Sequence, residues 1–439
     1  MEPTFSITSA TADPALLDLP WNLPLDLWPA DKIVSLPKGI SRHLVRFAHL
    51  SGHVIAIKET SQEMAKGEYE MLRTLGRLDV PCVEPLAVIT GRTDDEGNEL
   101  NPVLVTRHLR FSLPYRALYS QALGEDTARR LVDALALLLV RLHIIGFFWG
   151  DVSLSNTLFR RDAGAFAAYL VDAETGKLYP SGLSNGQREN DLEVARVNIA
   201  GELLDLQAGG RLDESTDPVE VAGQIVAQYR MLWSELLDSE VFDQKERWRI
   251  HHRVERLNAL GFDIEELAIK TVDAGTSVKI QPKVVDAGHH HRRLLGLTGV
   301  DAQENQARRL LNDLDQFAAR VRSEKPNLDF DEQQLAHKWL STHFEPIVSA
   351  IPRELRGKLE PAEVFHQVLE HRWYLAEQHQ KHIPLAEAIW SYIENVLRHR
   401  PDEAAMLDTS TQAIDIINGT EPSVEGEDAD ADVDWRDKV

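Results

Sequence analysis

The sequence lacks the features that would place the protein in or across a membrane. Cys82 is the only cysteine among 439 residues, which excludes a disulfide within the chain and predicts a reducing, cytoplasmic environment. No apolar run approaches the roughly 20 residues that a membrane-spanning helix needs. The acidic, proline-containing N-terminus has no basic region, so we expect neither a signal peptide nor a membrane span.

Positive charge is also scarce. The chain has 47 Lys and Arg against 70 Asp and Glu, a net charge of −23, which argues against a nucleic-acid partner. Part of the excess lies near the C-terminus, where residues 421–439 are mostly Glu, Asp, Gly and Ala. Such a segment has little to bury and is predicted to be disordered. The remaining composition is typical of a globular protein with two or three domains.

One short stretch carries the strongest chemical signal. Asp151 and Asn156 lie five positions apart and are followed by an apolar segment, and the strand Leu170-Val171 ends in Asp172. A hairpin between these segments would bring the three side chains together beside a metal ion. The Asp-x-x-x-x-Asn spacing also occurs by chance in surface loops, so further elements must support a catalytic interpretation.

Two such elements precede the stretch. Residues 53–58 form an apolar strand of the Val-Ala-Ile-Lys type, in which the terminal Lys58 would reach nucleotide phosphates. The alternative is a lysine that simply closes an edge strand. A helix predicted to begin at Thr60-Ser61-Gln62-Glu63, a capping-box pattern, places Glu68 on its inner face, where it can pair with Lys58; Glu70 is the alternate partner.

In this order, the elements resemble the protein-kinase-like superfamily, in particular the bacterial aminoglycoside, choline and lipopolysaccharide kinases. The resemblance implies that Asp151 is the catalytic base and that Lys58, fixed by Glu68, neutralises phosphate charge. It further implies that ATP and Mg²⁺ are the cofactors, that Lys58, Asn156 and Asp172 bind the nucleotide, and that Asn156 and Asp172 bind the metal. We also expect Asp191 to hydrogen-bond the catalytic loop, and Trp149 to pack under Asp151.

The sequence departs from the kinase pattern at two places. The turn at Pro37-Lys38-Gly39, where kinases carry a glycine-rich flap, has a single glycine. Asp172-Ala173-Glu174 replaces Asp-Phe-Gly, and Glu174 is either a further metal-shell carboxylate or a solvated loop residue. We favour the solvated residue.

The predicted fold class is α+β: a two-lobed protein-kinase-like fold, followed by a mainly α-helical domain and a disordered acidic tail. An extended N-terminal segment would dock its tryptophans on a neighbouring domain. The predicted boundaries are 1–30 for this segment, 31–212 for the kinase-like domain (sheet lobe 31–110, helical lobe 111–212), 213–400 for the helical domain and 401–439 for the tail.

The second half is predicted to be largely helical with one strand. Three adjacent histidines cannot all face one metal, so His289-His290-His291-Arg292-Arg293 is interpreted as a basic loop that binds phosphate or a partner or, the alternative that we favour, as a merely solvated loop. Residues 369–375 resemble a bacterial family that has an uncharacterised helical domain behind a lipopolysaccharide-kinase-like half. The strand is expected over 278–285, and the helices over 219–237, 243–260, 302–321, 331–344, 361–379 and 384–399.

These features predict transfer of the ATP γ-phosphoryl group to a hydroxyl. The acceptor stays open between a saccharide, a lipid-linked saccharide, a small metabolite and a protein. A nucleotide-binding pseudokinase that scaffolds a protein partner through the helical domain is the alternative. It would explain the missing glycine flap and the altered Asp-Phe-Gly motif.

Overall fold

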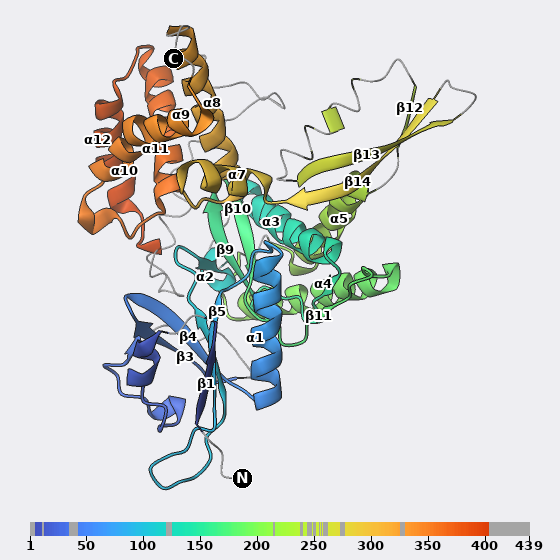
Figure 1. The fold of residues 1–439 in the computed structure, drawn as a ribbon, viewed down its shortest axis with the longest axis vertical. Coiled ribbons are helices and arrows are strands. Elements are labelled where there is room, and N and C mark those ends of the chain that lie inside the picture. The colour runs from blue at the N-terminus through green and yellow to red at the C-terminus, as the bar shows by residue number, and fades with distance from the viewer. Residues whose placement is uncertain are drawn as a thin grey trace. The chain divides into compact units, whose positions relative to one another are not determined.

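The structure is a computed structural model in which the protein has the predicted α+β class, with antiparallel sheets and a helical C-terminal region (Figure 1). The predicted turn at 37–39 and the acidic tail beyond residue 403 lie outside the described residues. The structure describes residues 5–10, 13–34, 43–119, 125–213, 216–237, 240–243, 248, 252–253, 255, 257, 262–272, 277–324 and 330–403.

The chain forms two compact units. Over the described residues, the first unit comprises Met1–Arg160 and Ala168–Arg230. The second unit comprises Arg161–Ala167 and the chain from Met231 onward. The second unit therefore includes the short hairpin tip at 161–167. The predicted domain boundaries stay predictions.

The first unit begins with a six-stranded antiparallel sheet of order β1-β5-β6-β4-β3-β2. Ser51 and Gly52, both with positive φ, form the tight turn between β3 and β4. The helix α1 (Gln62–Arg77) lies beside the sheet in Figure 1 and contacts β5 and β6. The strands are β1 (Ser6–Ser9), β2 (Ile33–Val34), β3 (Val45–Leu50), β4 (His53–Glu59), β5 (Pro85–Thr90) and β6 (Val103–Arg107).

The N-terminal segment packs on this sheet. β1 adds an edge strand to β5, and the 3₁₀ helices Pro14–Asp18 and Leu25–Leu27 follow. Trp21 and Trp28 are buried in one hydrophobic core with side chains of β3, β4, β5 and β6. The expected docking of the tryptophans is thus observed, but the segment is not simply extended.

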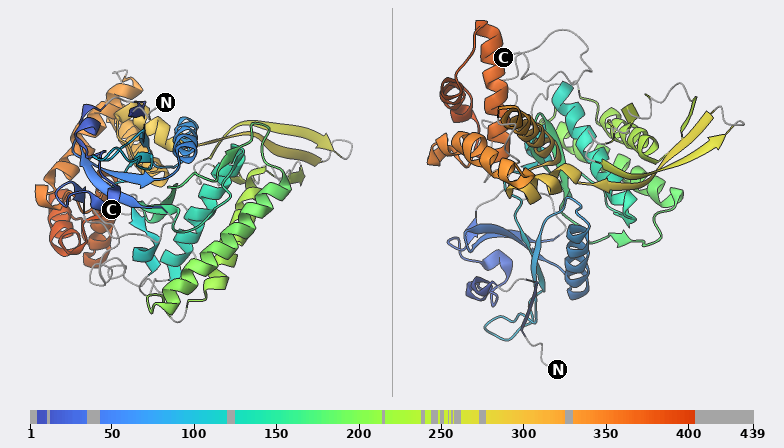
Figure 2. Two further views of the ribbon diagram at one scale, coloured as in Figure 1. Left: turned by 90° about the horizontal axis from the view of Figure 1, so that it is seen from below. Right: turned by 45° about the horizontal axis from the view of Figure 1, so that its top comes forward.

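The remainder of the first unit is helical with three short sheet pairings. The apolar run at 125–145 forms α3 (Glu125–Ile144), which ends at Gly146 with φ +83°. Figure 2 shows α3 beside the long helix α4 (Asn185–Ala208), and His143 of α3 forms a hydrogen bond with Asp191 of α4. The other elements are β7 (Leu113–Pro114), α2 (Tyr115–Tyr119), β8 (Phe147–Phe148), β9 (Thr157–Asp162), β10 (Ala165–Leu170), β11 (Lys177–Leu178), α4 (Asn185–Ala208) and α5 (Pro218–Leu237), whose last turns belong to the second unit.

The second unit consists of a three-stranded antiparallel sheet, in the order β12-β14-β13, and a helical core. Its helices bury apolar faces around Trp339, Phe344 and Phe365. The elements are β12 (Glu240–Asp243), β13 (Phe262–Val272), β14 (Ser277–Ala287), α7 (His289–Thr298), α8 (Glu304–Glu324), α9 (Glu332–Trp339), the π-helical segment Leu340–Phe344, α10 (Glu345–Ala350), the 3₁₀ helix Arg353–Leu355, α11 (Pro361–His379), α12 (Leu385–Asn395) and the 3₁₀ helix Leu397–His399.

Three local predictions for these units are wrong. The histidine run begins the helix α7 instead of forming a loop, because Glu304 accepts hydrogen bonds from the backbone N–H groups of His290 and His291. The sequence predicts a single strand here, over 278–285, whereas the structure also contains β12 and β13. Ser61 is the N-cap of helix α1, which begins at Gln62, and its side chain accepts from the backbone N–H of Met64; with Met64 at the third helical position, only the serine half of a capping box exists. The helix expected over 243–260 falls mostly outside the described residues.

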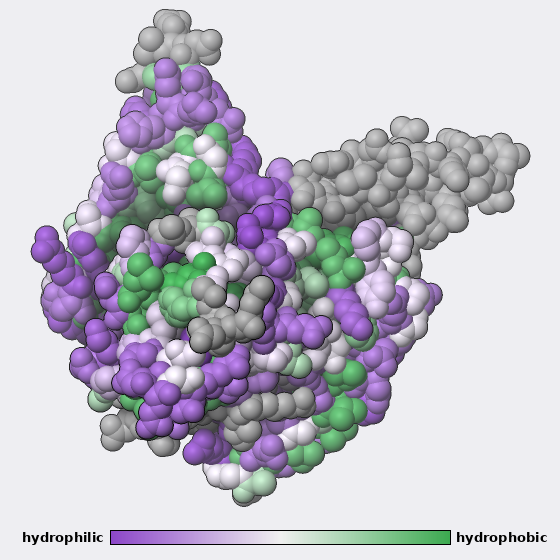
Figure 3. Space-filling view, turned by 60° about the horizontal axis from the view of Figure 1, so that its bottom comes forward, coloured by the Kyte–Doolittle hydropathy of each residue, from purple (hydrophilic) through white to green (hydrophobic). Residues whose placement is uncertain are grey.

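On the face drawn in Figure 3, hydrophobic residues gather in separate patches between hydrophilic ones. Among the described residues, no helix combines the length and the apolar character needed to cross a membrane.

Candidate active site

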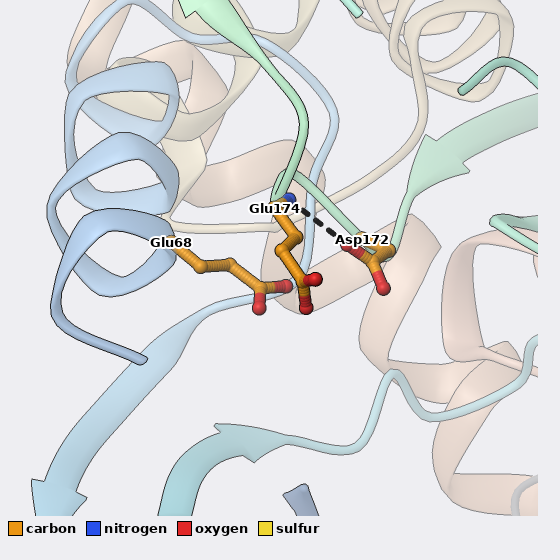
Figure 4. Close-up of side chains that lie close together, drawn as sticks. All are labelled: Glu68, Asp172 and Glu174. Atoms are coloured by element: carbon orange, nitrogen blue, oxygen red, sulfur yellow. Dashed lines mark hydrogen bonds between the residues drawn. The ribbon is translucent and has the colours of Figure 1, made fainter. Parts of the chain in front are cut away.

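The first unit places Lys58 among three carboxylates. Its Nζ lies 3.0 Å from Glu68 Oε2, 2.7 Å from Asp172 Oδ2 and 2.9 Å from Glu174 Oε2. Figure 4 shows the three acidic side chains converging, with the backbone N–H of Glu174 donating to Asp172 Oδ1. We call Lys58, Glu68, Asp172 and Glu174 the lysine cluster.

Local sequence explains how these residues meet. Lys58 lies near the end of β4, paired with Val45 and Leu104, in the middle of the sheet. In α1, Glu68 shares the buried face with Ala65 and Leu72, which follows from the three- and four-residue spacing of a helix. This spacing turns Glu68 toward the sheet.

The alternate partner of Lys58 lies elsewhere. Glu70 is exposed and forms a 3.7 Å ion pair with Arg73 on the helix surface. Between the two candidates from sequence, the structure therefore pairs Lys58 with Glu68.

The lysine cluster carries more negative than positive charge. Burial raises the pKa of Glu68 to about 7, and the neighbouring charge of Asp172 adds to this effect against the attraction of Lys58. Burial alone would lower the pKa of Lys58, but the adjacent carboxylates outweigh it and raise that pKa. Lys58 is therefore a firmly charged ammonium, and the site retains unneutralised negative charge.

Glu174 corrects one prediction. It is not a solvated loop residue: its side chain is 15% exposed, and its Oε2 lies 3.1 Å from His43 Nε2 as well as beside Lys58. The reason is the turn after Asp172, which directs Glu174 back toward the ammonium. The other interpretation from sequence, a metal-shell carboxylate, fits this position.

The loop residues Asp151 and Asn156 contact one another directly. Asn156 Nδ2 donates to the backbone oxygen of Asp151 at 3.0 Å and to its Oδ2 at 3.2 Å. The other carboxylate oxygen, Oδ1, accepts from Asn198 Nδ2 at 3.1 Å. Asp151 is half-buried, and its carboxylate is held by two amides, one on each oxygen.

A buried hydrogen-bond network holds the backbone of this loop. Asp191 accepts hydrogen bonds from the backbone N–H groups of Trp149 and Gly150, both at 2.7 Å, which confirms the predicted contact of Asp191 with the loop. His143 lies between Asp191 and the hydroxyl of Tyr229. Burial lowers the pKa of His143, so it is a neutral link in the network.

The loop and the lysine cluster are connected through the β9–β10 segment. Val171 N donates to Asn156 O at 3.0 Å, and Trp149 Nε1 donates to Asp172 O at 2.9 Å. Trp149 is fully buried, in agreement with its predicted packing role. The structure thus joins Asp151, Asn156 and Asp172 in one hydrogen-bonded assembly, and Asp172 joins them to Lys58 and Glu68.

The donor set fits a divalent cation. One carboxylate oxygen from each of Glu68, Asp172 and Glu174 lies within 4.8 Å of the others, and Asp172 and Glu174 are partly exposed. Magnesium prefers such oxygen ligands and keeps several waters. Asn156 commits its amide nitrogen to Asp151, so a cation would bind its Oδ1.

Sequence reasoning missed Asn198 and Glu202. Glu202 accepts hydrogen bonds from the backbone N–H groups of Leu154 and Ser155. Both residues lie on α4 at seven and eleven positions after Asp191. That spacing returns to the same helix face, and it is the signal that could have identified them.

Comparison with known proteins adds a family match for the second half of the chain. The model of the Domain of unknown function (DUF4032) matches residues 231–397. No curated protein matches the sequence.

Among solved structures, a chain titled "WaaP in complex with acyl carrier protein" matches with a TM-score of 0.33 and 14% sequence identity. The match covers 52% of this chain and 88% of that one.

Proposed function

We propose that the first unit is a Mg²⁺- and ATP-dependent phosphotransferase that moves the γ-phosphoryl group to a hydroxyl acceptor. The observation that carries this proposal is the convergence of Lys58, Glu68 and Asp172 in one ion-pair cluster, hydrogen-bonded to the loop of Asp151 and Asn156. An ammonium, two kinds of metal-ligating oxygen and a separate carboxylate are the groups that phosphoryl transfer requires.

Each residue then has a distinct task. Lys58, oriented by Glu68, contacts nucleotide phosphates, and Asn156 and Asp172 hold Mg²⁺, with Glu174 as a further oxygen ligand. The bound metal would neutralise charge that develops on the phosphates. All three carboxylates lie within ion-pair distance of the Lys58 ammonium, so Asp172 and Glu174 would have to turn away from it before its N–H groups could contact the nucleotide.

Asp151 would act on the acceptor. Its carboxylate accepts the hydroxyl proton as the acceptor oxygen forms a bond to the γ-phosphorus, while the bond from that phosphorus to the β,γ-bridging oxygen breaks and ADP leaves. The acceptor we propose is a saccharide or another small hydroxyl compound. A protein partner for the second unit is part of the proposal.

One observation favours a second candidate, a nucleotide-binding pseudokinase. Three carboxylates surround Lys58, so a nucleotide must displace at least one of them before it reaches the ammonium. A protein that binds nucleotide without transferring phosphoryl would tolerate this arrangement.

Phosphoryl transfer by wild type and Asp151→Asn separates the candidates. At saturating Mg-ATP, with water or a panel of saccharides as acceptors, Asp151→Asn should lower the rate by about 10²- to 10⁴-fold, the usual contribution of general-base assistance. Nucleotide affinity should stay close to wild type. Equal rates in the two proteins would refute the role of Asp151, and nucleotide binding without turnover would favour the pseudokinase.

A further inference from the structure

One face of α4 follows the catalytic loop along its length. Asp191, Asn198 and Glu202 share this face because their spacings of seven and eleven residues are close to whole helical turns. Their contacts follow the loop in chain order: Asp191 binds the N–H groups of 149 and 150, Asn198 binds residues 151 and 152, and Glu202 binds the N–H groups of 154 and 155.

Asn198 differs from its two neighbours on this face. Asp191 and Glu202 accept hydrogen bonds from backbone groups of the loop, whereas Asn198 Nδ2 donates both to Val152 O and to Asp151 Oδ1, each at 3.1 Å. Asn198 is therefore the residue of this face that contacts the proposed base itself.

The two oxygens of Asp151 are held from different elements. Asn156 of the loop donates to Oδ2, and Asn198 of α4 donates to Oδ1. A carboxylate oxygen has two lone pairs, so each can accept one amide and still accept an acceptor hydroxyl. With one donor per oxygen, rotation of the carboxylate would break at least one hydrogen bond.

We propose that Asn198 is a positioning residue that fixes the orientation of the Asp151 carboxylate for the acceptor hydroxyl. This inference rests on the proposed phosphotransferase function. Catalysis depends on near-attack geometry, and small displacements of a reacting group reduce rates strongly. Asn198 acts on the acceptor side of the reaction, since Lys58, Asn156 and Asp172 are the residues assigned to the nucleotide and its metal.

The kinetic test compares wild type with Asn198→Leu, a change of similar size that removes the amide donor. With Mg-ATP and water as the acceptor, kcat should fall by about 10- to 100-fold, while KM for Mg-ATP stays within about twofold of wild type. Asn190→Leu, at an exposed position of the same helix, is the matched control and should leave both constants unchanged. A raised KM with unchanged kcat would overturn the positioning role.

A double substitution adds a readout that general destabilisation would not produce. In an Asp151→Ala background, Asn198→Leu should cause no further loss of kcat, because the group that it positions is gone. Multiplicative losses would show that Asn198 acts independently of Asp151 and would overturn the inference.

A stability cycle keeps this inference separate from the proposed function. Urea unfolding midpoints of wild type, Asn198→Leu, Asp151→Ala and the double variant should be non-additive if the side chains interact, and strictly additive midpoints would contradict the contact. If Asn198→Leu does not fold, Asn198→Ser takes its place in the cycle. A wild type that neither binds nor turns over Mg-ATP would refute the phosphotransferase, whereas the cycle still decides whether Asn198 holds Asp151.

Discussion

Each of the two units contains a cluster of carboxylates, and the two clusters differ in how many hydrogen-bond donors and cations surround them. The lysine cluster of the first unit sets three carboxylates against one ammonium and is partly exposed. The second unit buries Asp162, Glu363 and Glu403, which we call the tip cluster because Asp162 lies in the hairpin tip at 161–167. The lysine cluster is therefore suited to binding a ligand, and the tip cluster to stabilising the fold.

Hydrogen-bond donors from the protein satisfy the tip cluster. Asp162 accepts from the backbone N–H groups of Asn305 and Gln306 and from the Asn305 side chain. Glu363 accepts from the backbone N–H of Ala163 and from Gln306 and Gln367.

The third carboxylate, Glu403, pairs with Arg161 at 2.9 Å. Burial raises the pKa of Asp162 to about 6, so it is still ionised at neutral pH. A carboxylate with this many internal donors leaves little for a ligand to supply, and the tip cluster is therefore structural.

The lysine cluster, by contrast, has more carboxylates than positively charged partners. Its acidic groups share a single lysine, with His43 at the margin of Glu174, and the pKa of Glu68 is raised as a result of burial and of Asp172. Excess negative charge at a partly exposed position favours a cation. The comparison therefore predicts that substitutions in the tip cluster affect stability, and substitutions in the lysine cluster affect ligand binding.

The largest effect is expected from Asp162→Ala. The change leaves two buried backbone N–H groups and one side-chain amide without their acceptor, and each unsatisfied donor costs about 1–3 kcal/mol. We expect the free energy of unfolding of the second unit to fall by about 3 kcal/mol or more, measured by urea denaturation. Asp301→Ala, at a side chain that is 80% exposed, is the control and should leave stability unchanged. If Asp162→Ala has the same free energy of unfolding as wild type, the proposed distinction between the two clusters is wrong.

A smaller loss of stability is expected from Lys58→Met. It leaves three carboxylates without their cation, but Asp172 is 31% exposed and can gain hydration, so the cost should be about 2 kcal/mol, below that of a fully buried pair. Millimolar Mg²⁺ should restore part of the lost stability by neutralising the same charges, while nucleotide binding stays impaired. Thermal melts with and without Mg²⁺ test this. Equal losses in both conditions would show that the carboxylates do not attract the ion.

The pH dependence of stability sharpens the comparison further. The folded-state pKa of Glu68 is raised to about 7, so its contribution to stability is complete below about pH 4 and is lost as pH rises through 7. Glu68→Gln should flatten this slope and change the melting temperature between pH 5 and 8 by a few degrees. Melts across this range in Mg²⁺-free buffer provide the measurement. An identical slope in the variant would assign the titration to another group.

The smallest effect is expected from Glu70→Gln. Glu70 pairs with Arg73 on the helix surface, and such pairs contribute about 0.2–0.5 kcal/mol. Stability and Mg-ATP binding should both stay close to wild type. If nucleotide binding falls to the level of Glu68→Gln, then Glu70, the alternate that the sequence left open, is the functional partner of Lys58.

Much of the first unit was predictable because its signals are local. The apolar run at 53–58 predicts the strand that the structure shows as β4, and helical spacing places Glu68 on the inner face of α1. The interval between Asn156 and Asp172 predicted the hairpin that the structure contains. Asp191 was expected to hydrogen-bond the loop and does so.

The missed features depend on contacts between distant residues. The sequence favours a solvated Glu174 because no local pattern shows that a turn returns it to Lys58, which lies 116 positions earlier in the chain. The sequence predicts a loop at the histidine run because the acceptor that caps this helix, Glu304, comes from the next helix. Strand β13 depends on its pairing with β14, which tertiary contacts decide.

Calorimetric titration of Mg-ATP into wild type, Asp172→Ala and Asp162→Asn tests the central claim most directly, namely that the lysine cluster binds a metal–nucleotide complex and the tip cluster does not. Wild type should bind only weakly without Mg²⁺ and more tightly with it. Asp172→Ala should lose the Mg²⁺-dependent gain, and Asp162→Asn, although less stable, should retain it. No Mg²⁺-dependent binding by folded wild type, or an undiminished gain in Asp172→Ala, would contradict the assignment of the lysine cluster.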